Sequence, residues 1–450
     1  MQYRDYFKDK KITVMGLGLL GRGVGDAEFL ARSGADLIVT DLKTKKQLKS
    51  SLDRLKKFKN IKYVLGKHRL QDFRDRDMIL KSAGVPLDSS YIKEAKKNKI
   101  PVEMSASLLA KLSGVKIIGV TGTRGKTTIT HLIYQILKNS DVGRLKNIFL
   151  GGNIRGISTL SLLGKVKKGD IVVTELDSWQ LQGFGDSKIS PHIAVFTNLM
   201  RDHMNYYKGN MKKYFQDKSN IYKHQKTGDY LIAGKEISKK IQNTKDGPLL
   251  LQRTVLCVPK PLPKNWKLKI LGEHNRQNAA FAAVAANAAG VPKKIIKQTI
   301  ENFKGVPGRL ELVKIVRGIK IYNDTTATTP NATIVALKAL SKNKNIILII
   351  GGADKGLDMA ELIKEIPKYC KSVILLDGTG TRKMQKSKIK MQNDNVKIQN
   401  ANSLKTAFNL AMKNANRNDI VLFSPAFASF EMFKNEYDRG EQFNSLVNSL

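Results

Sequence analysis

The sequence predicts an α/β protein of three domains, each built on a mainly parallel sheet. Three observations carry this prediction. The 450 residues suffice for two to four domains, at roughly 100 to 200 residues per domain. Short apolar strands alternate with helical patterns along the whole chain, as in parallel sheets with helical crossovers. Glycine-rich turns follow two of these strands, at points where a helical pattern begins.

The first predicted domain opens with a strand, a glycine turn, a helical pattern and a second strand over residues 11–41. Gly16, Gly18 and Gly21 fit the spacing G-x-G-x-x-G, and Asp41 stands where dinucleotide-binding proteins carry a ribose-binding acid. Taken alone, this pattern predicts a dinucleotide-binding turn. Any diphosphate could use the same turn and helix N-terminus, however, so the pattern does not identify the ligand.

The remaining elements of the first domain are predicted from two further segments. Residues 77–86 predict a strand followed by a loop, and residues 90–114 predict a helix, a short strand and a second helix. The alternation of strand and helix therefore continues up to a boundary that we place near residue 110.

The second domain begins with a strand, a phosphate-binding loop and a helix over residues 115–140. The loop departs from the pattern G-x-x-x-x-G-K-[ST], because Val120 replaces its first glycine. Its context still predicts that backbone amides cradle phosphates, that Lys126 reaches the β- and γ-phosphates, and that the Thr127 hydroxyl binds Mg²⁺. Further elements are two strands at 170–178 and 193–199 and an alanine-rich helix at 272–290.

The third domain follows the Pro-Gly punctuation of residues 303–316. Its predicted strands lie at 320–324, 345–352, 372–378 and 419–425, separated by helical patterns. The predicted domains are therefore 1–110, 111–308 and 309–450.

The chain carries a formal charge of +41, from 79 lysine and arginine residues against 38 acidic residues. Such an excess is typical of nucleic-acid-binding proteins, but the lysines are scattered and lack the interleaved aromatic residues of a single-strand groove. We therefore favour a solvated, lysine-rich surface that attracts small anionic substrates, with a functional polyanion surface as the alternative. Cys257 and Cys370 lack metal-ligand spacing. No membrane span or signal peptide is predicted, so we expect a cytoplasmic protein.

The glycine spacing G-T-x-G-K-T-T over residues 122–128 resembles that of the ATP-dependent Mur ligase and folylpolyglutamate synthetase superfamily. The motif "VVTELDSWQLQGF" resembles the strand-end glutamate motif of that family and implies that Glu175 binds Mg²⁺. "FTNLMRDHMNYY" resembles the T-N-x-x-x-D-H motif and implies that His203 binds a second Mg²⁺. Lys218, fifteen residues further on, stands where the family has a lysine that forms a carbamate with CO₂.

The resemblance also implies a nucleotide site and a metal set. The residues implied to bind ATP are Gly122, Thr123, Gly125, Lys126, Thr127, Thr128, Asn275, Asn278, Arg309 and Asp324. Those implied to hold two Mg²⁺ ions are Thr127, Glu175, His203 and Lys218. Catalysis would rest on Lys126, Glu175, His203 and Lys218.

The outer domains are implied to bind the other substrates. The "SPAFASF" block and the following "FKNEYDRG" narrow the resemblance to members that add D-glutamate to UDP-N-acetylmuramoyl-L-alanine through an acyl phosphate, in peptidoglycan precursor synthesis. A Rossmann-like first domain would bind the UDP substrate through Gly18, Leu19, Asp41, Ser82 and Gly84, with Asn153 from the P-loop domain. A Rossmann-like third domain would bind D-glutamate through Thr328, Lys355, Ser429 and Phe430. We expect a monomer without nucleic-acid or membrane partners.

Three positions depart from the family pattern. Asp177 replaces a common serine, Arg201 precedes Asp-His where proline or an acid is usual, and Thr326 stands where some members carry lysine. A carboxylate at position 177 could repel an acidic substrate. Three alternatives stay open: a ligase of the same superfamily with another amino acid, a basic P-loop ATPase that acts on nucleic acid, and a dehydrogenase with bound NAD.

Overall fold

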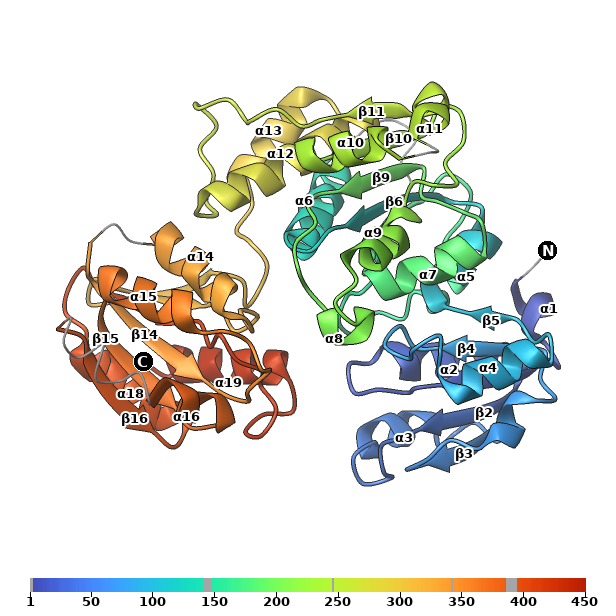
Figure 1. The fold of residues 1–450 in the computed structure, drawn as a ribbon, viewed down its shortest axis with the longest axis horizontal. Helices are drawn as coiled ribbons and strands as arrows, with labels where there is room; N and C mark the ends of the chain where they lie inside the picture. The colour runs from blue at the N-terminus through green and yellow to red at the C-terminus, as the bar shows by residue number, and fades with distance from the viewer. Residues whose placement is uncertain (1–2, 141–146, 245–246, 341–342, 386–394) are drawn as a thin grey trace. The chain divides into compact units, whose positions relative to one another are not determined.

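The computed structural model describes residues 3–140, 147–244, 247–340, 343–385 and 395–450 (Figure 1). The chain divides into two compact units. The first comprises Met1–Pro263 and Asn278–Ile300, and the second comprises Lys264–Gln277 and Glu301–Leu450. Three separate sheets confirm the predicted α/β class with mainly parallel sheets. The boundaries near 110 and 308 stay predictions.

The N-terminal sheet is wholly parallel, in the order β3-β2-β1-β4-β5. Because β2 and β4 flank β1 on opposite sides, their connections diverge at its carboxyl end, which is where open α/β sheets bind ligands. The strands are β1 (Lys11–Met15), β2 (Asp36–Asp41), β3 (Ile61–Leu65), β4 (Met78–Lys81) and β5 (Val102–Glu103). The helices are α1 (Tyr3–Phe7), α2 (Arg22–Arg32), α3 (Lys49–Leu55), η1 (Leu70–Phe73) and α4 (Ser90–Lys97).

The central sheet is also parallel, in the order β11-β10-β9-β6-β8-β7. Here the connections diverge at the carboxyl end of β6, between β8 and β9. Its strands are β6 (Lys116–Thr121), β7 (Ile148–Gly152), β8 (Ile171–Glu175), β9 (Ile193–Phe196), β10 (Tyr230–Ala233) and β11 (Val255–Cys257). The helices are α5 (Ser105–Ser113), α6 (Lys126–Lys138), η2 (Leu160–Gly164), α7 (Ser178–Asp186), α8 (Met204–Tyr207), α9 (Met211–Ser219), α10 (Lys235–Gln242), α11 (Gly247–Arg253), α12 (Glu273–Ala288) and α13 (Lys293–Asn302).

The second unit contains a mixed sheet in the order β12-β13-β17-β14-β15-β16, antiparallel only between β12 and β13. Its strands are β12 (Glu311–Val316), β13 (Ile319–Asn323), β14 (Ile346–Gly351), β15 (Cys370–Leu376), β16 (Lys397–Ala401) and β17 (Ile420–Phe423). The helices are α14 (Pro330–Leu340), α15 (Ala360–Tyr369), α16 (Thr379–Gln385), α18 (Leu404–Asn414) and α19 (Glu436–Asn448).

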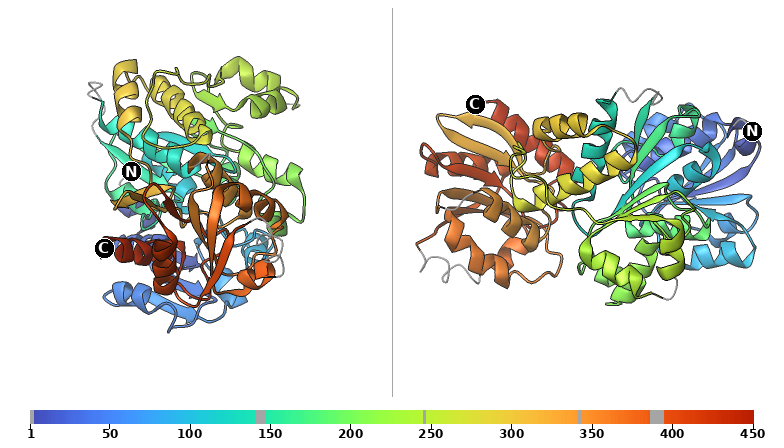
Figure 2. Two further views of the ribbon diagram at one scale, coloured as in Figure 1. Left: turned by 90° about the vertical axis from the view of Figure 1, so that its left-hand side faces the viewer. Right: turned by 90° about the horizontal axis from the view of Figure 1, so that it is seen from above.

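The sheet of the second unit is buried on both faces (Figure 2). Alternate residues of β14 enter different apolar clusters: Ile346, Leu348 and Ile350 pack with α14 and α15, whereas Ile347 and Ile349 pack with α18 and α19. A strand covered on both faces reads as a continuous apolar run, which explains why "NIILIIGG" was recognisable as a strand.

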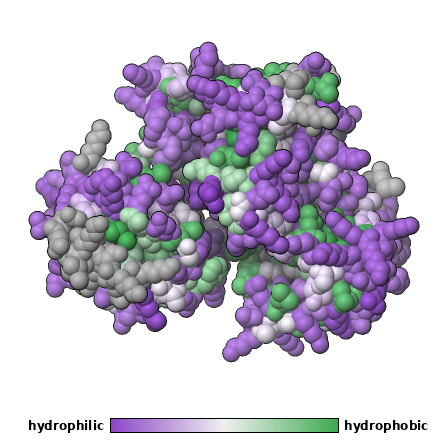
Figure 3. Space-filling view, in the orientation of Figure 1, coloured by the Kyte–Doolittle hydropathy of each residue, from purple (hydrophilic) through white to green (hydrophobic). Residues whose placement is uncertain are grey.

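The N-terminal sheet shares its core with the neighbouring part of the first unit. The apolar cluster around β1 and α2 also contains Leu108 of α5 and Leu160 of η2. The face of the molecule in Figure 3 is mostly hydrophilic, as 79 lysine and arginine residues lead one to expect. Within the described residues, no helix is both long and apolar enough to span a membrane.

Candidate active site

The phosphate-loop sequence lies between the end of β6 at Thr121 and the start of α6 at Lys126. Gly125 is the N-cap of α6 and has a left-handed backbone with φ of 86°. A Cβ atom at this position would lie 2.3 Å from Asn278 Oδ1 of α12, so only glycine fits without displacement. Thr127 and Thr128 form the first turn of the helix, where backbone amides and the helix dipole favour anions.

The inside of this loop is held by residues of the segment that follows β9. The side-chain oxygen of Asn198 accepts hydrogen bonds from Thr123 N (3.1 Å) and Arg124 N (2.9 Å). The Thr123 hydroxyl bonds the backbone of Met200, through both its carbonyl and its amide. Thr123 therefore shapes the loop with its own polar groups, and its predicted contact with ATP stays a prediction. The role of Asn198 was not predicted.

Two lysine side chains converge on one carbonyl oxygen of the loop. Lys126 Nζ lies 3.0 Å from Gly122 O, and Lys218 Nζ also lies 3.0 Å from it. Lys218 is 1% exposed and further donates to Thr121 Oγ1 at 3.3 Å. Burial, followed by the nearby charge of Lys126, holds the pKa of Lys218 well below its usual range. The arrangement therefore favours an uncharged, nucleophilic amine at position 218.

Glu175 ends β8 beside this loop and is 4% exposed. Its Oε1 accepts a hydrogen bond from Asn153 Nδ2 at 3.3 Å, whereas its Oε2 is buried without a partner in the described residues. A buried carboxylate oxygen without a donor is costly unless a cation or a bound ligand satisfies it. This orphaned oxygen suits a divalent cation, whose preferred ligands are oxygen atoms.

His203 precedes α8 and has a left-handed backbone with φ of 55°. Its ring packs against Trp179 with the ring centroids 4.7 Å apart, and its Nε2 lies 3.9 Å from Asp202 Oδ2. Burial lowers the pKa of His203 against the opposing effect of Asp202, so the ring is neutral at pH 7 and can bind a metal ion. Among the described residues, no three histidine, cysteine or acidic side chains gather as a complete metal site.

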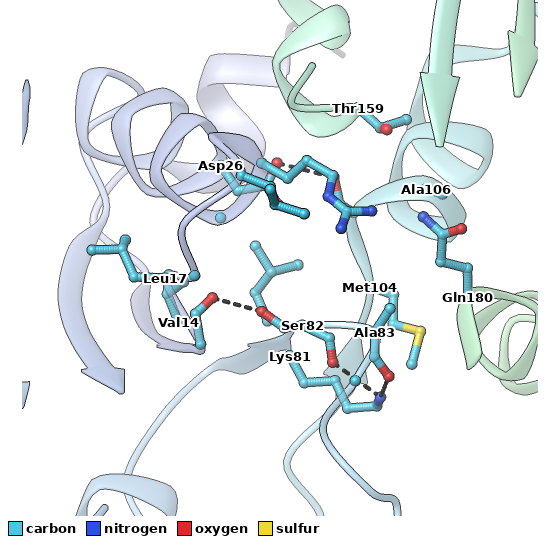
Figure 4. A pocket seen from close by; sticks show the side chains of 18 of the residues that line it. Val14, Leu17, Asp26, Lys81, Ser82, Ala83, Met104, Ala106, Thr159 and Gln180 are labelled. Atoms are coloured by element: carbon cyan, nitrogen blue, oxygen red, sulfur yellow. Dashed lines mark hydrogen bonds between the residues drawn. The ribbon is translucent and has the colours of Figure 1, made fainter. Parts of the chain in front are cut away.

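A second concave site lies at the carboxyl ends of β1 and β4 (Figure 4). Its cavity measures about 220 Å³, and its lining includes Gly18, Leu19, Ser82 and Gly84 of the predicted substrate set. Asp41 lies behind the turn, where its Oδ2 accepts hydrogen bonds from Leu17 N (2.8 Å) and Gly18 N (3.0 Å). The structure thus brings these predicted residues together around one cavity and its supporting turn.

Charged residues of this cavity were missed by the sequence reasoning. Lys81 is 3% exposed and donates to the carbonyls of its own loop, with Val85 O closest at 2.9 Å; burial lowers its pKa to about 8. Asp26 of α2 accepts hydrogen bonds from Ser158 Oγ (2.6 Å) and Ser105 Oγ (3.0 Å), and burial raises its pKa to about 6. Figure 4 shows both side chains at the cavity.

Arg22 also lines the cavity, and hydrogen bonds connect it through Asn153 to Glu175. Its guanidinium donates to Asn153 Oδ1, and Asn153 in turn donates to Glu175. Asn153, which is predicted to bind the UDP substrate, therefore lies between the cavity and Glu175, which is predicted to bind Mg²⁺. The contact of Asn153 with the substrate stays a prediction.

In the second unit, predicted residues follow the carboxyl ends of three strands. Asp324, after β13, accepts hydrogen bonds from Leu310 N (3.0 Å) and Ser424 Oγ (2.9 Å), and burial raises its pKa to about 7. Lys355, after β14, donates to Thr328 Oγ1 at 3.0 Å. An antiparallel bridge between Ala353 and Ala428 joins the loop of Lys355 to the loop after β17.

The other predicted residues of this unit differ in exposure. Ser429 is 3% exposed and Phe430 is 63% exposed, although they are adjacent in the loop after β17. Arg309 precedes β12, and Asn275 at the start of α12 donates to Leu271 O at 2.8 Å. Their contacts with nucleotide or amino acid stay predictions.

Two of the three residues that depart from the family pattern, Asp177 and Thr326, have local structural explanations. Asp177 is the N-cap of α7: its side chain accepts from Gln180 N at 2.8 Å, and the Gln180 side chain accepts from Asp177 N at 3.2 Å. This reciprocal pair is a capping box, which stabilises the helix start. The Thr326 hydroxyl donates to Gly308 O at 3.0 Å. Arg201 is exposed, and nothing in the structure explains its choice.

Comparison with protein families matches residues 10–103 to the MurD-like N-terminal domain of Mur ligases, 120–249 to the Mur ligase middle domain, and 308–427 to the glutamate ligase domain. Among solved structures, the chain resembles the UDP-N-acetylmuramate-alanine ligase MurC of Thermotoga maritima, with a TM-score of 0.59, 19% identity and coverage of 98% and 99% of the two chains. It also resembles MurF ligase of T. maritima in complex with ADP, with a TM-score of 0.56, 18% identity and coverage of 100% and 97%.

Two curated relatives cover nearly the whole chain. The UDP-N-acetylmuramoylalanine--D-glutamate ligase of Borreliella afzelii (strain PKo) is 37% identical over 99% of each sequence. The ligase of the same name from Roseiflexus sp. (strain RS-1) is 35% identical over 98% of this chain and 99% of the relative. Identity at this level over the full length, together with the three matched domains, shows that the chain belongs to the Mur ligase family.

Proposed function

We propose that the chain is an ATP-dependent ligase that adds D-glutamate to UDP-N-acetylmuramoyl-L-alanine in the synthesis of peptidoglycan precursors. The observation that carries the chemistry is the convergence of Lys126 and Lys218 on Gly122 O, beside the N-terminus of α6. The positive charge of Lys126 and the N-terminus of α6 at one point suit a polyphosphate. The full-length relatives with this activity in their names support the choice of substrates.

In the proposed reaction, the alanyl carboxylate of the UDP substrate attacks the γ-phosphate of ATP, forming an acyl phosphate and releasing ADP. The amine of D-glutamate then attacks the acyl carbon, and phosphate leaves as the amide bond forms. The first step brings two anions together, so it requires positive charge at the γ-phosphate. Lys126 supplies that charge at the end of the phosphate loop, and the protein otherwise positions the reactants.

Magnesium fits this site because a buried oxygen of Glu175 lacks a donor and the His203 ring is neutral at pH 7. We propose that Glu175, His203 and the Thr127 hydroxyl hold Mg²⁺ in two sites. Bound there, Mg²⁺ would neutralise phosphate charge and orient the γ-phosphate. Asn153 would fix the Glu175 carboxylate through its hydrogen bond at 3.3 Å.

Lys218 is proposed to carry a carbamate. The neutral Nζ would attack CO₂, forming an N–C bond, and would lose one proton to solvent. An ammonium at this position would repel both Lys126 and Mg²⁺, whereas a carbamate contributes an anionic oxygen ligand. The burial of Lys218 and its lowered pKa support the proposal, because both favour the uncharged amine that reacts with CO₂.

The remaining substrate contacts are assigned to the two units separately. The cavity at the ends of β1 and β4 is proposed to hold the UDP substrate, and Thr328, Lys355, Ser429 and Phe430 the D-glutamate. Asn275, Asn278, Arg309 and Asp324 are proposed to contact ATP. We further propose that the enzyme works as a monomer in the cytoplasm on small-molecule substrates, without nucleic-acid or membrane partners.

The test is phosphate release from ATP and UDP-N-acetylmuramoyl-L-alanine with a panel of amino acids. Release should require D-glutamate and should stay at background with L-glutamate, L-alanine or meso-diaminopimelate. Equal turnover with L-alanine or meso-diaminopimelate would contradict the proposed specificity. ATP hydrolysis that DNA or RNA stimulates, and that no amino acid affects, would instead support a nucleic-acid-dependent ATPase.

A further inference from the structure

Three lysine or arginine residues are buried in the described part of the chain: Lys81, Lys218 and Arg439, with 3%, 1% and 0% of their surface exposed. None of the three forms an ion pair with a described carboxylate. Burying a cation without a counter-ion is costly unless hydrogen bonds satisfy it. Lys81 and Lys218 bond carbonyls of the two loops already described, whereas Arg439 has no role in the proposed reaction.

The Arg439 guanidinium joins two loops of the second unit. Its Nε donates to Thr325 Oγ1 at 3.1 Å and its Nη2 to Thr325 O at 2.8 Å. Its Nη1 donates to Phe427 O at 3.3 Å. Thr325 follows β13 and Phe427 follows β17, so one side chain from α19 fixes the ends of two neighbouring parallel strands.

Neighbouring contacts hold α19 close to the first of these loops. The Thr325 hydroxyl donates to Glu436 O at 2.9 Å, and Asn323 Nδ2 donates to Gly440 O at 3.2 Å. A Cβ atom at position 440 would lie 2.6 Å from Thr325 Cγ2, so the residue after Arg439 must be small. The N-terminal half of α19 is therefore built around the Thr325 backbone.

Both loops carry residues assigned to D-glutamate. Thr328 lies three positions after Thr325, and Ser429 lies two positions after Phe427. Lys355 is tied to the same loops through its bond to Thr328 and through the bridge between Ala353 and Ala428. Burial lowers the pKa of Arg439 to about 10, so the guanidinium stays charged at neutral pH.

We propose that Arg439 is a positioning residue for the amino-acid substrate: it holds the loops of residues 324–328 and 424–430 at a fixed separation, so that a dicarboxylic amino acid binds across both. The guanidinium does not itself touch the substrate, because all its surface is buried. This inference rests on the proposed function, which assigns D-glutamate to these loops. A lysine cannot replace the guanidinium, because a single ammonium cannot reproduce its planar fork of donors.

The experiment measures KM for D-glutamate and for UDP-N-acetylmuramoyl-L-alanine in the wild type and three full-length variants. Arg439→Lys keeps the charge but loses the fork of donors. Thr325→Val keeps Arg439 but removes one acceptor, and it decides the question if Arg439→Lys fails to fold. Arg76→Lys is the control, because only 8% of the Arg76 side chain is exposed and its guanidinium likewise donates to two carbonyls, in the first unit.

In Arg439→Lys, KM for D-glutamate should rise at least tenfold while KM for the UDP substrate stays within twofold. Thr325→Val should show the same split with a smaller rise, and Arg76→Lys should change neither KM. A folded Arg439→Lys, by circular dichroism, with unchanged KM for D-glutamate would overturn the inference, as would a loss of kcat alone. If the wild type itself releases no phosphate with D-glutamate, the proposed function fails instead, and the two failures are distinct.

Discussion

Two glycine turns of the first unit have nearly the same backbone but different surroundings. Gly21 and Gly125 each cap a helix, α2 and α6, with φ/ψ of 83°/−11° and 86°/−14°. Each turn follows a strand at which the connections of its sheet diverge. On backbone shape alone, both would be described as phosphate-binding turns.

The difference lies in the side chains that reach back to each turn. The first turn is held by Asp41, whose carboxylate accepts two of its amides, and Asp26 lies in the adjoining cavity. The second turn is held by the neutral amide of Asn198, and two lysines converge on it. At the first turn Asp41 accepts hydrogen bonds from two amides that a phosphate could otherwise use, and Lys81 and Arg22 line the adjoining cavity. At the second turn the charge of Lys126 favours a polyphosphate. Glycine spacing therefore specifies the shape of a turn, and the returning side chains select its ligand.

The largest effect on kcat is expected at Lys126, beside the second turn. Lys126→Ala should lower kcat by about 100-fold or more, because it removes a charge that stabilises the transferring phosphate. Lys138→Ala, at the other end of the same helix, is the matched control and should leave kcat unchanged. Steady-state phosphate release measures both. A loss below tenfold in Lys126→Ala would break the comparison between the turns.

The next largest effect is expected at Lys218 of α9, whose Nζ also contacts Gly122 O in that turn. Lys218→Ala should abolish most activity, and millimolar acetate or formate should restore part of it by supplying the missing carboxylate oxygens. The lowered pKa of Lys218 leaves more of the amine neutral at pH 7 than an exposed lysine would have, so carbamate formation is favoured there. Near-normal turnover of the variant in bicarbonate-depleted buffer would remove Lys218 from the site.

A third prediction concerns the carboxyl group of Asp26, which lines the cavity beside the first turn. Burial raises the pKa of Asp26 to about 6, above the usual value of 3.8 for an aspartate. A raised pKa means that folding favours the protonated form, so this contribution to stability is complete below pH 4 and disappears as pH rises through 6. Relative to Asp26→Asn, the wild type should lose about 2 to 3 kcal/mol of unfolding free energy between pH 4 and 7. Chemical denaturation at both pH values measures the difference, and a pH-independent difference would contradict it.

The smallest effect is expected at Asp177. Asp177→Ser should change kcat and KM less than twofold and the free energy of unfolding by less than about 0.5 kcal/mol, because serine and aspartate are similar helix N-caps. The comparison variant Asp177→Ala should cost about 1 kcal/mol, since alanine cannot cap α7. If Asp177→Ser markedly improves KM or kcat, the carboxylate opposes catalysis despite its capping role.

Elements and residues that depend on local pattern were predictable from the sequence. The strands ending at Thr121 and Gly351 are continuous apolar runs, and Lys126 stands at a fixed place in a recognisable loop. Strand β12 was not predicted, because it is a partly exposed antiparallel edge next to the Pro-Gly boundary.

Residues whose roles depend on distant partners were missed. Asn198 binds amides 74 and 75 positions away, and Arg439 binds a carbonyl 114 positions away. Both residues stand in motifs that the sequence singled out, T-N-x-x-x-D-H and "FKNEYDRG". Their roles were missed because only the fold brings their partners near. The same holds for Lys81, whose burial depends on how its sheet packs.

The most direct test of the central claim, that charge gives two similar turns different ligands, is calorimetric titration of Lys126→Ala and Asp41→Ala. Each would be titrated with a non-hydrolysable ATP analogue and with UDP-N-acetylmuramoyl-L-alanine. We predict that Lys126→Ala weakens only the ATP analogue, and Asp41→Ala only the UDP substrate, each by at least tenfold, with the other affinity within twofold. If both variants weakened the same ligand, or each weakened both ligands equally, the account would be contradicted.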